Sequence, residues 1–219
     1  MVVAIDGPAG VGKSTIAACV ARRTRFLYIN SGSFYRCITK QVLDTGTDPE
    51  NRDDIIRIAS ACEFEMRKHK LYLNGRRVGK DIHSDEVDRW VAAHSSIPEV
   101  REIVNRSLRR IAADLDIVME GRDISTVVFP QAEVKIFLDA PLRIRTHRRL
   151  HQGVSDLTEE ELSKSLSARD RVDINKPTGR LEMARDAQYI DTTDLTIERV
   201  CDRVIAEIHK KVDPTRRQQ

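Results

Sequence analysis

The chain has 219 residues, of which 40% are hydrophobic and 32% are charged, proportions that are ordinary for a globular protein and exclude a largely disordered one. Its net charge of +3 is too small to indicate nucleic-acid binding by itself. No apolar run approaches the roughly 18 residues of a membrane span, and the first residues lack a signal-peptide layout. We expect a cytoplasmic monomer that binds neither nucleic acid nor membranes.

The first fifteen residues contain the most specific motif. An apolar run over residues 2–5 leads into a segment of the form G-x-x-x-x-G-K-S, which is typical of a phosphate-binding loop. Glycines let such a loop turn its N–H groups toward a polyphosphate, the lysine reaches the β- and γ-phosphates, and the serine hydroxyl binds Mg²⁺. A helix-periodic run over residues 15–23 follows, which disfavours a glycine turn without a ligand. The expected site residues are Gly7, Pro8, Ala9, Gly10, Val11, Gly12, Lys13, Ser14 and Thr15, with Ser14 as the metal ligand.

Residues 26–29 are predicted to form a short strand that ends in a polar turn. Serines in the turn, residues 31–33, can cap a helix that runs to about residue 45. The turn lies at the carboxyl end of a strand, where open α/β sheets bind their ligands. Ser31 and Arg36 are therefore candidates to hold an acceptor, and the alternative is a helix cap followed by a surface arginine.

The segment after this helix breaks the strand–helix alternation. Residues 53–62 read as a helix, and residues 63–78 alternate apolar and polar positions around the tight-turn pair Asn74-Gly75. This pattern predicts a small antiparallel β insert in a separate lobe. Two helices follow over residues 87–94 and 98–111. The apolar stripe of the second helix leaves Arg101 on a different face, either in solvent or at a site.

Charged residues occupy the ends of two later apolar strands. Residues 117–123 end in Glu120, Arg122 and Asp123, and residues 134–139 end in Asp139. Charged groups at the ends of buried strands are unusual unless they pair or bind a ligand. Because the carboxyl ends of parallel strands share one edge of the sheet, we expect both tips to face the phosphate-binding loop.

An arginine-rich segment over residues 142–151 leads into a turn at Gly153, which suggests either a mobile lid over a triphosphate or a solvated basic face. Residues 167–177 alternate charges around Arg169 and Asp173, as ligand contacts or as an exposed helix end. A strand over 188–191, a helix over 197–212 and a polar tail over 213–219 close the chain. The cysteines lack metal-ligand spacing and are expected to be reduced thiols: Cys19, Cys37, Cys62 and Cys201.

Over essentially its whole length the chain resembles bacterial cytidylate kinases. The stretches that carry the resemblance are residues 5–14, 31–36, 98–101, 121–123, 126–130 and 134–140. The resemblance implies an α/β P-loop kinase in which helices flank a five-stranded parallel sheet, with ATP and Mg²⁺ as donor and CMP or dCMP as acceptor. It also implies a single domain over 1–219, with a core of 1–45 and 112–212, a monophosphate-binding insert that contains the small β sheet at about 46–111, and a lid at about 145–176.

By the same resemblance, Lys13, Arg122 and Asp123 would be catalytic, and Arg145 and Arg149 would join the loop in binding ATP. The residues expected around the acceptor are Ser31, Arg36, Arg101, Arg122, Asp123, Arg169 and Asp173, with Asp173 and Arg101 near the base. The chain departs from the family at Lys176, where arginine is usual, at Glu120, where aspartate is common, and at Ala92, where a serine near the cytosine is frequent. These positions concern base recognition rather than phosphoryl transfer.

Two other functions stay open on the sequence. A nucleoside kinase would phosphorylate a neutral hydroxyl and would use Glu120 as its base. A non-catalytic nucleotide-binding module would need the loop but no acceptor site. The several arginines favour a monophosphate acceptor, because a nucleoside offers no phosphate for them to bind.

Overall fold

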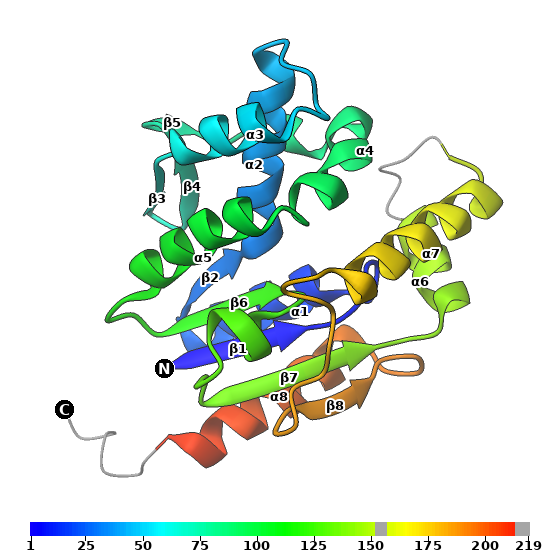
Figure 1. The fold of residues 1–219 in the computed structure, drawn as a ribbon. Coiled ribbons are helices and arrows are strands. Elements are labelled where there is room, and N and C mark those ends of the chain that lie inside the picture. Colours follow the sequence, from blue (N-terminus) through cyan, green and yellow to red (C-terminus); the bar gives the residue numbers. More distant parts are fainter. Residues whose placement is uncertain (152–156, 213–219) are drawn as a thin grey trace.

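The computed structural model describes residues 1–151 and 157–212, so Gly153 and the polar tail over 213–219 lie outside the described residues. The centre of the fold is a five-stranded sheet in the order β2-β6-β1-β7-β8 (Figure 1). All of its strand pairs are parallel, which confirms the predicted five-stranded parallel sheet. The strands are β1 (Val2–Asp6), β2 (Leu27–Asn30), β6 (Ile117–Gly121), β7 (Val134–Asp139) and β8 (Gln188–Asp191).

Helices cover both faces of this sheet. Because successive side chains of a strand point to opposite faces, Ala4 joins one hydrophobic cluster while its neighbours Val3 and Ile5 join the other. The first cluster packs under α2 (Ser31–Asp44), α3 (Arg52–Ser60) and α5 (Pro98–Ala112). The second packs against α1 (Lys13–Thr24) and α8 (Ile197–Lys211). Burial on both faces explains why the central strands read as continuous apolar runs.

The segment between α3 and α5 forms the predicted antiparallel insert, with strands β3 (Phe64–Arg67), β4 (Lys70–Leu73) and β5 (Arg76–Arg77). Asn74-Gly75 makes one of its turns, with φ of +49° and +75°. The other turn, at Lys68-His69, also has positive φ at both residues, a geometry that matches the twist of a hairpin. A short 3₁₀ turn, Asp81–His83, and α4 (Asp85–His94) complete the insert.

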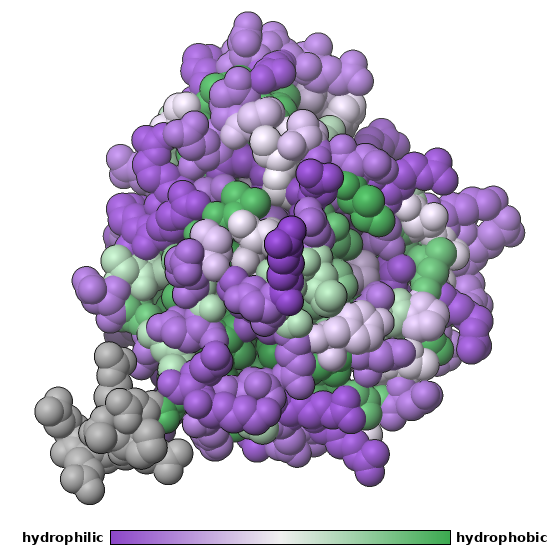
Figure 2. Space-filling model, turned by 60° about the horizontal axis from the view of Figure 1, so that its bottom comes forward, coloured by the Kyte–Doolittle hydropathy of each residue, from purple (hydrophilic) through white to green (hydrophobic). Residues whose placement is uncertain are grey.

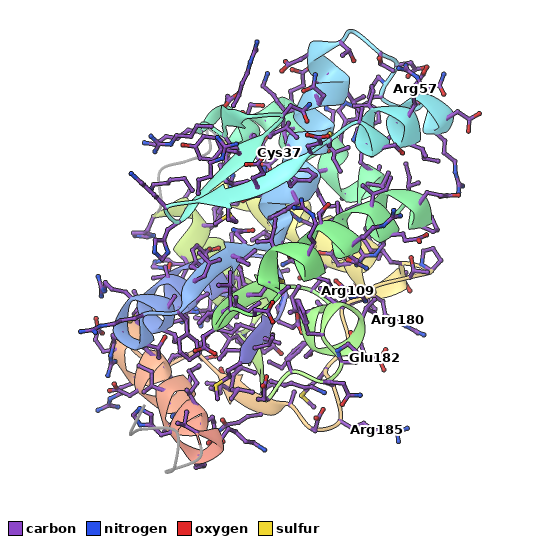
Figure 3. The ribbon with its side chains drawn as sticks, turned by 90° about the vertical axis from the view of Figure 1, so that its left-hand side faces the viewer. Cys37, Arg57, Arg109, Arg180, Glu182 and Arg185 are labelled. Atoms are coloured by element: carbon purple, nitrogen blue, oxygen red, sulfur yellow. The ribbon has the colours of Figure 1, made fainter. Side chains whose placement is uncertain are left out.

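The insert packs against the sheet through aromatic and aliphatic side chains. The rings of Phe34 in α2 and Phe64 in β3 lie 4.7 Å apart between their centroids. Cys37 is buried beneath the small sheet, whereas Arg57 extends from the outer end of the lobe (Figure 3). The lobe and the main sheet therefore share one hydrophobic cluster, which fixes the position of α4 relative to the strand ends.

The remaining helices lie at the carboxyl ends of the strands. A π-helical turn (Ile124–Val128) follows β6, while α6 (Leu142–Leu150) and α7 (Glu159–Asn175) pack side by side beyond β7 (Figure 1). Thr158 begins α7 with a reciprocal capping box to Glu161, as expected for an acidic helix start. In the loop from α7 to β8, Arg180 pairs with Glu182 at 3.4 Å (Figure 3).

Small groups of hydrophobic residues are scattered among hydrophilic ones on the face drawn in Figure 2. In the described segments, 1–151 and 157–212, no helix is both long and apolar enough to cross a bilayer. The predicted free thiols are confirmed at Cys19, Cys37, Cys62 and Cys201. The sulfur atoms of Cys19 in α1 and Cys201 in α8 lie 2.7 Å apart, which marks the close packing of these two helices.

Gly7 marks a close approach between the end of β1 and β7. Its φ is +152°, and a Cβ atom placed there would lie 2.2 Å from the carbonyl oxygen of Leu138. Any side chain would therefore push the start of the phosphate-binding loop away from β7, because real Cβ atoms essentially never come within 3.0 Å of another heavy atom in this way.

We expect Gly7→Ala to lower the free energy of unfolding by about 1–3 kcal/mol, the usual range for overpacking. The measurement is the urea midpoint of the purified protein. Gly75→Ala is the matched control, since Gly75 also has positive φ but no atom lies within 4 Å of the added Cβ. A loss for Gly7→Ala no larger than that for Gly75→Ala would contradict the close approach.

Candidate functional site

A cleft of about 700 Å³ lies at the carboxyl ends of the strands, between the phosphate-binding loop, the insert and α7. The sequence-predicted residues that line it are Ala9, Gly10, Gly12, Lys13, Ser14, Thr15, Ser31, Arg36, Arg101, Arg122, Asp123, Arg149, Arg169 and Asp173. Those that do not line it are Gly7, Pro8, Val11 and Arg145. The structure thus brings segments that are distant in sequence to one concave surface.

The phosphate-binding loop ends where α1 begins. Gly12 precedes the helix with φ of +99°, and as a glycine it has no side chain with which to cap this helix end. The first N–H groups of α1 and its dipole therefore favour an anion in the cleft. Lys13 is 6% exposed and donates through Nζ to the carbonyl oxygen of Pro8 at 2.7 Å. Burial, together with the nearby charge of Arg122, lowers the pKa of Lys13 well below its usual value.

Helix α6 supports this loop from behind. The Arg145 guanidinium donates to the carbonyl oxygens of Ala140 at 2.9 Å and Ala9 at 3.0 Å, and it pairs with Asp170 of α7 at 2.6 Å. Arg148 reaches the carbonyl oxygen of Val11 at 3.4 Å. Because its donors are engaged with the loop backbone and with Asp170, Arg145 is placed to hold the loop rather than to line the cleft.

A buried carboxylate positions the tip of β6. Asp6 is fully buried at the end of β1 and accepts hydrogen bonds from the N–H groups of Ile124 and Ser125, both at 2.8 Å, and from the Ser125 hydroxyl at 2.6 Å. Burial raises the pKa of Asp6, while these donors stabilise its ionised form. The turn that follows Arg122 and Asp123 is therefore fixed to the central strand.

Two hydroxyl groups hold Glu120, which lies near the carboxyl end of β6. Tyr28 donates to Glu120 Oε1 at 2.7 Å, and the Ser31 hydroxyl donates to the Glu120 carbonyl oxygen, also at 2.7 Å. The end of β7 adjoins the loop as expected, with the carbonyl oxygen of Leu138 against Gly7, but the side chain of Asp139 does not line the cleft. Its carboxylate accepts from the backbone N–H of Ala140 at 2.8 Å and lies 3.4 Å from the Tyr189 hydroxyl.

Buried ion pairs connect the cleft wall. Arg101 pairs with Asp123, and their side chains are 5% and 6% exposed. Asp173 accepts from Arg122 Nε and from Lys176 Nζ, each at 2.7 Å. Burial opposes the charge of Asp173, but Arg122 and Lys176 outweigh it and hold its pKa well below the usual value. Arg101, predicted to lie away from the apolar stripe of its helix, is thus a buried wall residue.

One end of the cleft combines an aromatic ring with polar groups. The Arg101 guanidinium carbon lies 5.5 Å from the centre of the Tyr35 ring. Lys176 also donates to the Ser95 hydroxyl at 3.0 Å, and that hydroxyl donates to the Ala92 carbonyl oxygen at 3.0 Å. Gly179 packs on Arg101 so closely that a Cβ there would lie 2.0 Å from the Arg101 Nη2 atom. This end is polar, and its charged side chains are buried.

Several cleft residues were not singled out from the sequence. Tyr35 reads as part of an apolar helix face, Ser95 as the end of a helix, and Asp88 as one of the acidic residues in a helix first turn. Asp170 reads as one charge in an alternating run. Each has an ordinary local explanation, and only the tertiary fold brings it to the cleft or to the loop behind it.

Comparison with known proteins decides the family. A family model described as "Cytidylate kinase" matches residues 3–210. The chain belongs to the cytidylate kinase family. It is 41% identical to a cytidylate kinase of Alkaliphilus oremlandii, over 93% of this chain and 95% of that one. It is 40% identical to a cytidylate kinase of Caldanaerobacter subterraneus subsp. tengcongensis, over 95% and 94% of the two chains.

Solved structures support the fold of this family member independently. A shikimate kinase from Bacteroides thetaiotaomicron superimposes with a TM-score of 0.51 at 12% identity, over 95% of this chain and 98% of that one. An uncharacterized protein from Eubacterium ventriosum gives 0.53 at 13% identity, over 96% and 98%. At such low identities the likeness shows a shared fold and nothing about the substrate.

The Arg101–Asp123 pair gives a direct test of the cleft wall. We expect Asp123→Ala to lower the free energy of unfolding by about 3–5 kcal/mol, because it leaves a buried guanidinium without its carboxylate. Urea denaturation measures the change. Asp202→Ala, which breaks the exposed Arg23–Asp202 pair, is the control and should change the midpoint far less. Similar losses of unfolding free energy for the two variants would show that the buried Arg101–Asp123 pair stabilises the protein no more than an exposed pair does.

Proposed function

We propose that this protein transfers the γ-phosphoryl group of ATP to CMP or dCMP, which yields ADP and CDP or dCDP. The observation that carries the proposal is the convergence of cationic side chains on one cleft beside the phosphate-binding loop. They come from α1, α2, the β6 tip, α6 and α7: Lys13, Arg36, Arg122, Arg149 and Arg169. The relatives that share about 40% of the sequence are named cytidylate kinases, which supports the acceptor.

The donor end of the cleft suits ATP with Mg²⁺. The uncapped start of α1 and the left-handed backbone at Gly10 and Gly12 leave N–H groups available for the triphosphate. Lys13 would bind its β- and γ-phosphates, Arg149 would approach from α6, and Ser14 would hold Mg²⁺. When bound, the metal would neutralise negative charge on the phosphate oxygens. Arg145 would act through the loop that it supports.

The acceptor end would place the phosphate and the base at different residues. Arg36, Arg122 and Arg169, with the Ser31 hydroxyl nearby, would bind the monophosphate. The end between Arg101 and Asp173 would bind the base, with Asp123 fixing Arg101. The buried Lys176 already donates to both Asp173 and Ser95, so a single ammonium maintains contacts on two walls of this pocket.

Catalysis would depend on positioning and charge rather than on a base. A nucleotide phosphate is already ionised at neutral pH, so the obstacle is the repulsion between two anionic groups. Lys13 and the arginines would offset the charge of the transferring oxygens, while α6 and α7 would exclude water. A nucleoside kinase would need Glu120 as a base, but its carboxylate already accepts a hydrogen bond from Tyr28.

We also propose that the protein is a cytoplasmic monomer that binds small molecules but not nucleic acid. Within the single domain, residues of about 46–111 would move as the monophosphate-binding lobe. Residues of about 145–176 would move as the lid, which makes α6 and α7 the mobile wall of the donor site. The packing of α6 against α7 supports movement of the two helices together.

The acceptor is tested by measuring ADP production from ATP and Mg²⁺ with CMP, dCMP, UMP, AMP or cytidine. We expect CMP and dCMP to stimulate ADP formation well above the other compounds, and EDTA to abolish it. Stimulation by cytidine alone would indicate a nucleoside kinase. ATP hydrolysis that no acceptor stimulates would indicate a non-catalytic or regulatory module.

Lys13→Ala should lower kcat by about 10²–10³-fold, the usual effect of removing one preorganised group that stabilises developing charge. Steady-state kinetics with CMP measure the loss, and circular dichroism checks that the variant folds. Lys40→Ala is the matched control, because Lys40 lies on α2 outside the cleft and pairs with Asp44. Near wild-type turnover of Lys13→Ala would rule out this role for the loop.

A further inference from the structure

Asp88 is a carboxylate in the wall of the cleft with arginines from three other helices around it. On α4, it pairs with Arg36 of α2, and its oxygens lie 3.7 Å from Arg169 Nη1 of α7 and 3.9 Å from Arg149 Nη2 of α6. It lines the cleft together with all three arginines. One anion of the insert is therefore in contact with both the acceptor side and the lid side of the site.

One of the arginines around Asp88, Arg169, lies in surroundings that disfavour its positive charge. Burial, followed by the charge of Arg122 and with a contribution from Arg36, lowers the pKa of Arg169 to about 10, whereas Asp173 and Asp88 raise it. Without nucleotides, carboxylates are the anions that offset this repulsion. Within residues 1–151 and 157–212, Asp173 is shared between Arg122 and Lys176. In the same residues, the carboxylate of Asp88 pairs with Arg36 and lies within 3.9 Å of Arg149 and Arg169.

We propose that Asp88 is a built-in substitute for the acceptor's phosphate: it holds the arginines in place in the empty site and is displaced from them when a phosphate binds. The proposal rests on the proposed function, since it assigns these arginines to the acceptor's phosphate. It makes Asp88 a positioning residue that sets the affinity for monophosphates without touching the reacting atoms.

The geometry allows this exchange without rebuilding the site. Arg36 also donates through Nη1 to the carbonyl oxygen of Ile82 at 3.1 Å, so its guanidinium stays anchored when the Asp88 contact is lost. The Asp88 side chain is 28% exposed, so water can solvate the carboxylate after displacement. A phosphate near −2 charge with three oxygens can serve several arginines at once, whereas a carboxylate has one charge and two oxygens.

The exchange would also couple acceptor binding to lid movement. Asp88 connects the insert, through α4, to α6 and α7, and α4 packs directly on α7. When the acceptor's phosphate binds Arg169 in place of Asp88, the insert contacts these helices through the bound substrate rather than through the Asp88 carboxylate. The contact that organises the empty site thus gives way to one that forms only with the acceptor bound.

The test compares wild type with Asp88→Asn, which removes the charge but keeps the shape. We expect KM for CMP to fall by about two- to fivefold, the factor expected for one partly exposed charge pair, with kcat little changed. Titration calorimetry with inorganic phosphate should show tighter binding to the variant by a similar factor. Cytidine, tested as a competitive inhibitor against CMP, should bind both proteins equally because it lacks the phosphate.

Asp85→Asn is the matched control. Asp85 lies on the same helix and lines the cleft, but it forms no ion pair within residues 1–151 and 157–212. It should change neither KM nor phosphate affinity by more than a small fraction of the Asp88→Asn effect. Asp88→Ala should act in the same direction as Asp88→Asn, which guards against an effect of the new amide.

Weaker or unchanged phosphate binding by Asp88→Asn would overturn the proposal, because it would show that the carboxylate supports the arginines during binding or has no influence on them. This readout does not depend on turnover. If wild type fails to phosphorylate CMP, the proposed function fails, but calorimetry still decides whether Asp88 competes with a phosphate for the arginines.

Discussion

Repulsion between like charges is the constraint that shapes this site. A cleft that must hold two phosphorylated substrates needs many cations at close range, and the empty protein has to keep them there. The structure meets this need by interleaving carboxylates with the cations: Asp123 with Arg101, Asp173 with Arg122 and Lys176, Asp88 with Arg36, and Asp170 with Arg145. Buried charges of this kind are tolerated only when their partners are well placed, so the positions of the backbone elements matter as much as the side chains.

The parallel sheet provides that placement. Because β1 and β6 are parallel neighbours, the loop after β1 and the carboxyl end of β6 lie at the same edge of the sheet. Asp6 connects them by accepting hydrogen bonds from the turn after Asp123. Gly7 allows β1 and β7 to approach closely, while Arg145 holds the loop through the carbonyl oxygens of Ala9 and Ala140. The cleft is consequently fixed on its sheet side, and the insert and the proposed lid form its other sides.

Local features were the ones that the sequence predicted well. The phosphate-binding loop is contiguous, so its spacing alone identified Lys13 and Ser14, and the alternating run around Asn74-Gly75 indicated the antiparallel insert. Pairings across the fold were not predictable: Arg101 and Asp123 are separated by other elements, and Asp88 looked like any acid in a helix first turn. Position at the end of a strand was also insufficient to predict which side chains line the cleft, because the Asp139 carboxylate accepts a hydrogen bond from the N–H of Ala140 instead. Arg145 and Arg149 come from one arginine-rich helix, but only Arg149 lines the cleft.

The most direct measurement is a crystal structure of the protein with CMP and a non-hydrolysable ATP analogue with Mg²⁺. We predict that the CMP phosphate lies within hydrogen-bond distance of Arg36, Arg122 and Arg169, the base between Arg101 and Asp173, and the γ-phosphate beside Lys13. A CMP phosphate bound away from these arginines, or a triphosphate that leaves the loop unoccupied, would contradict it.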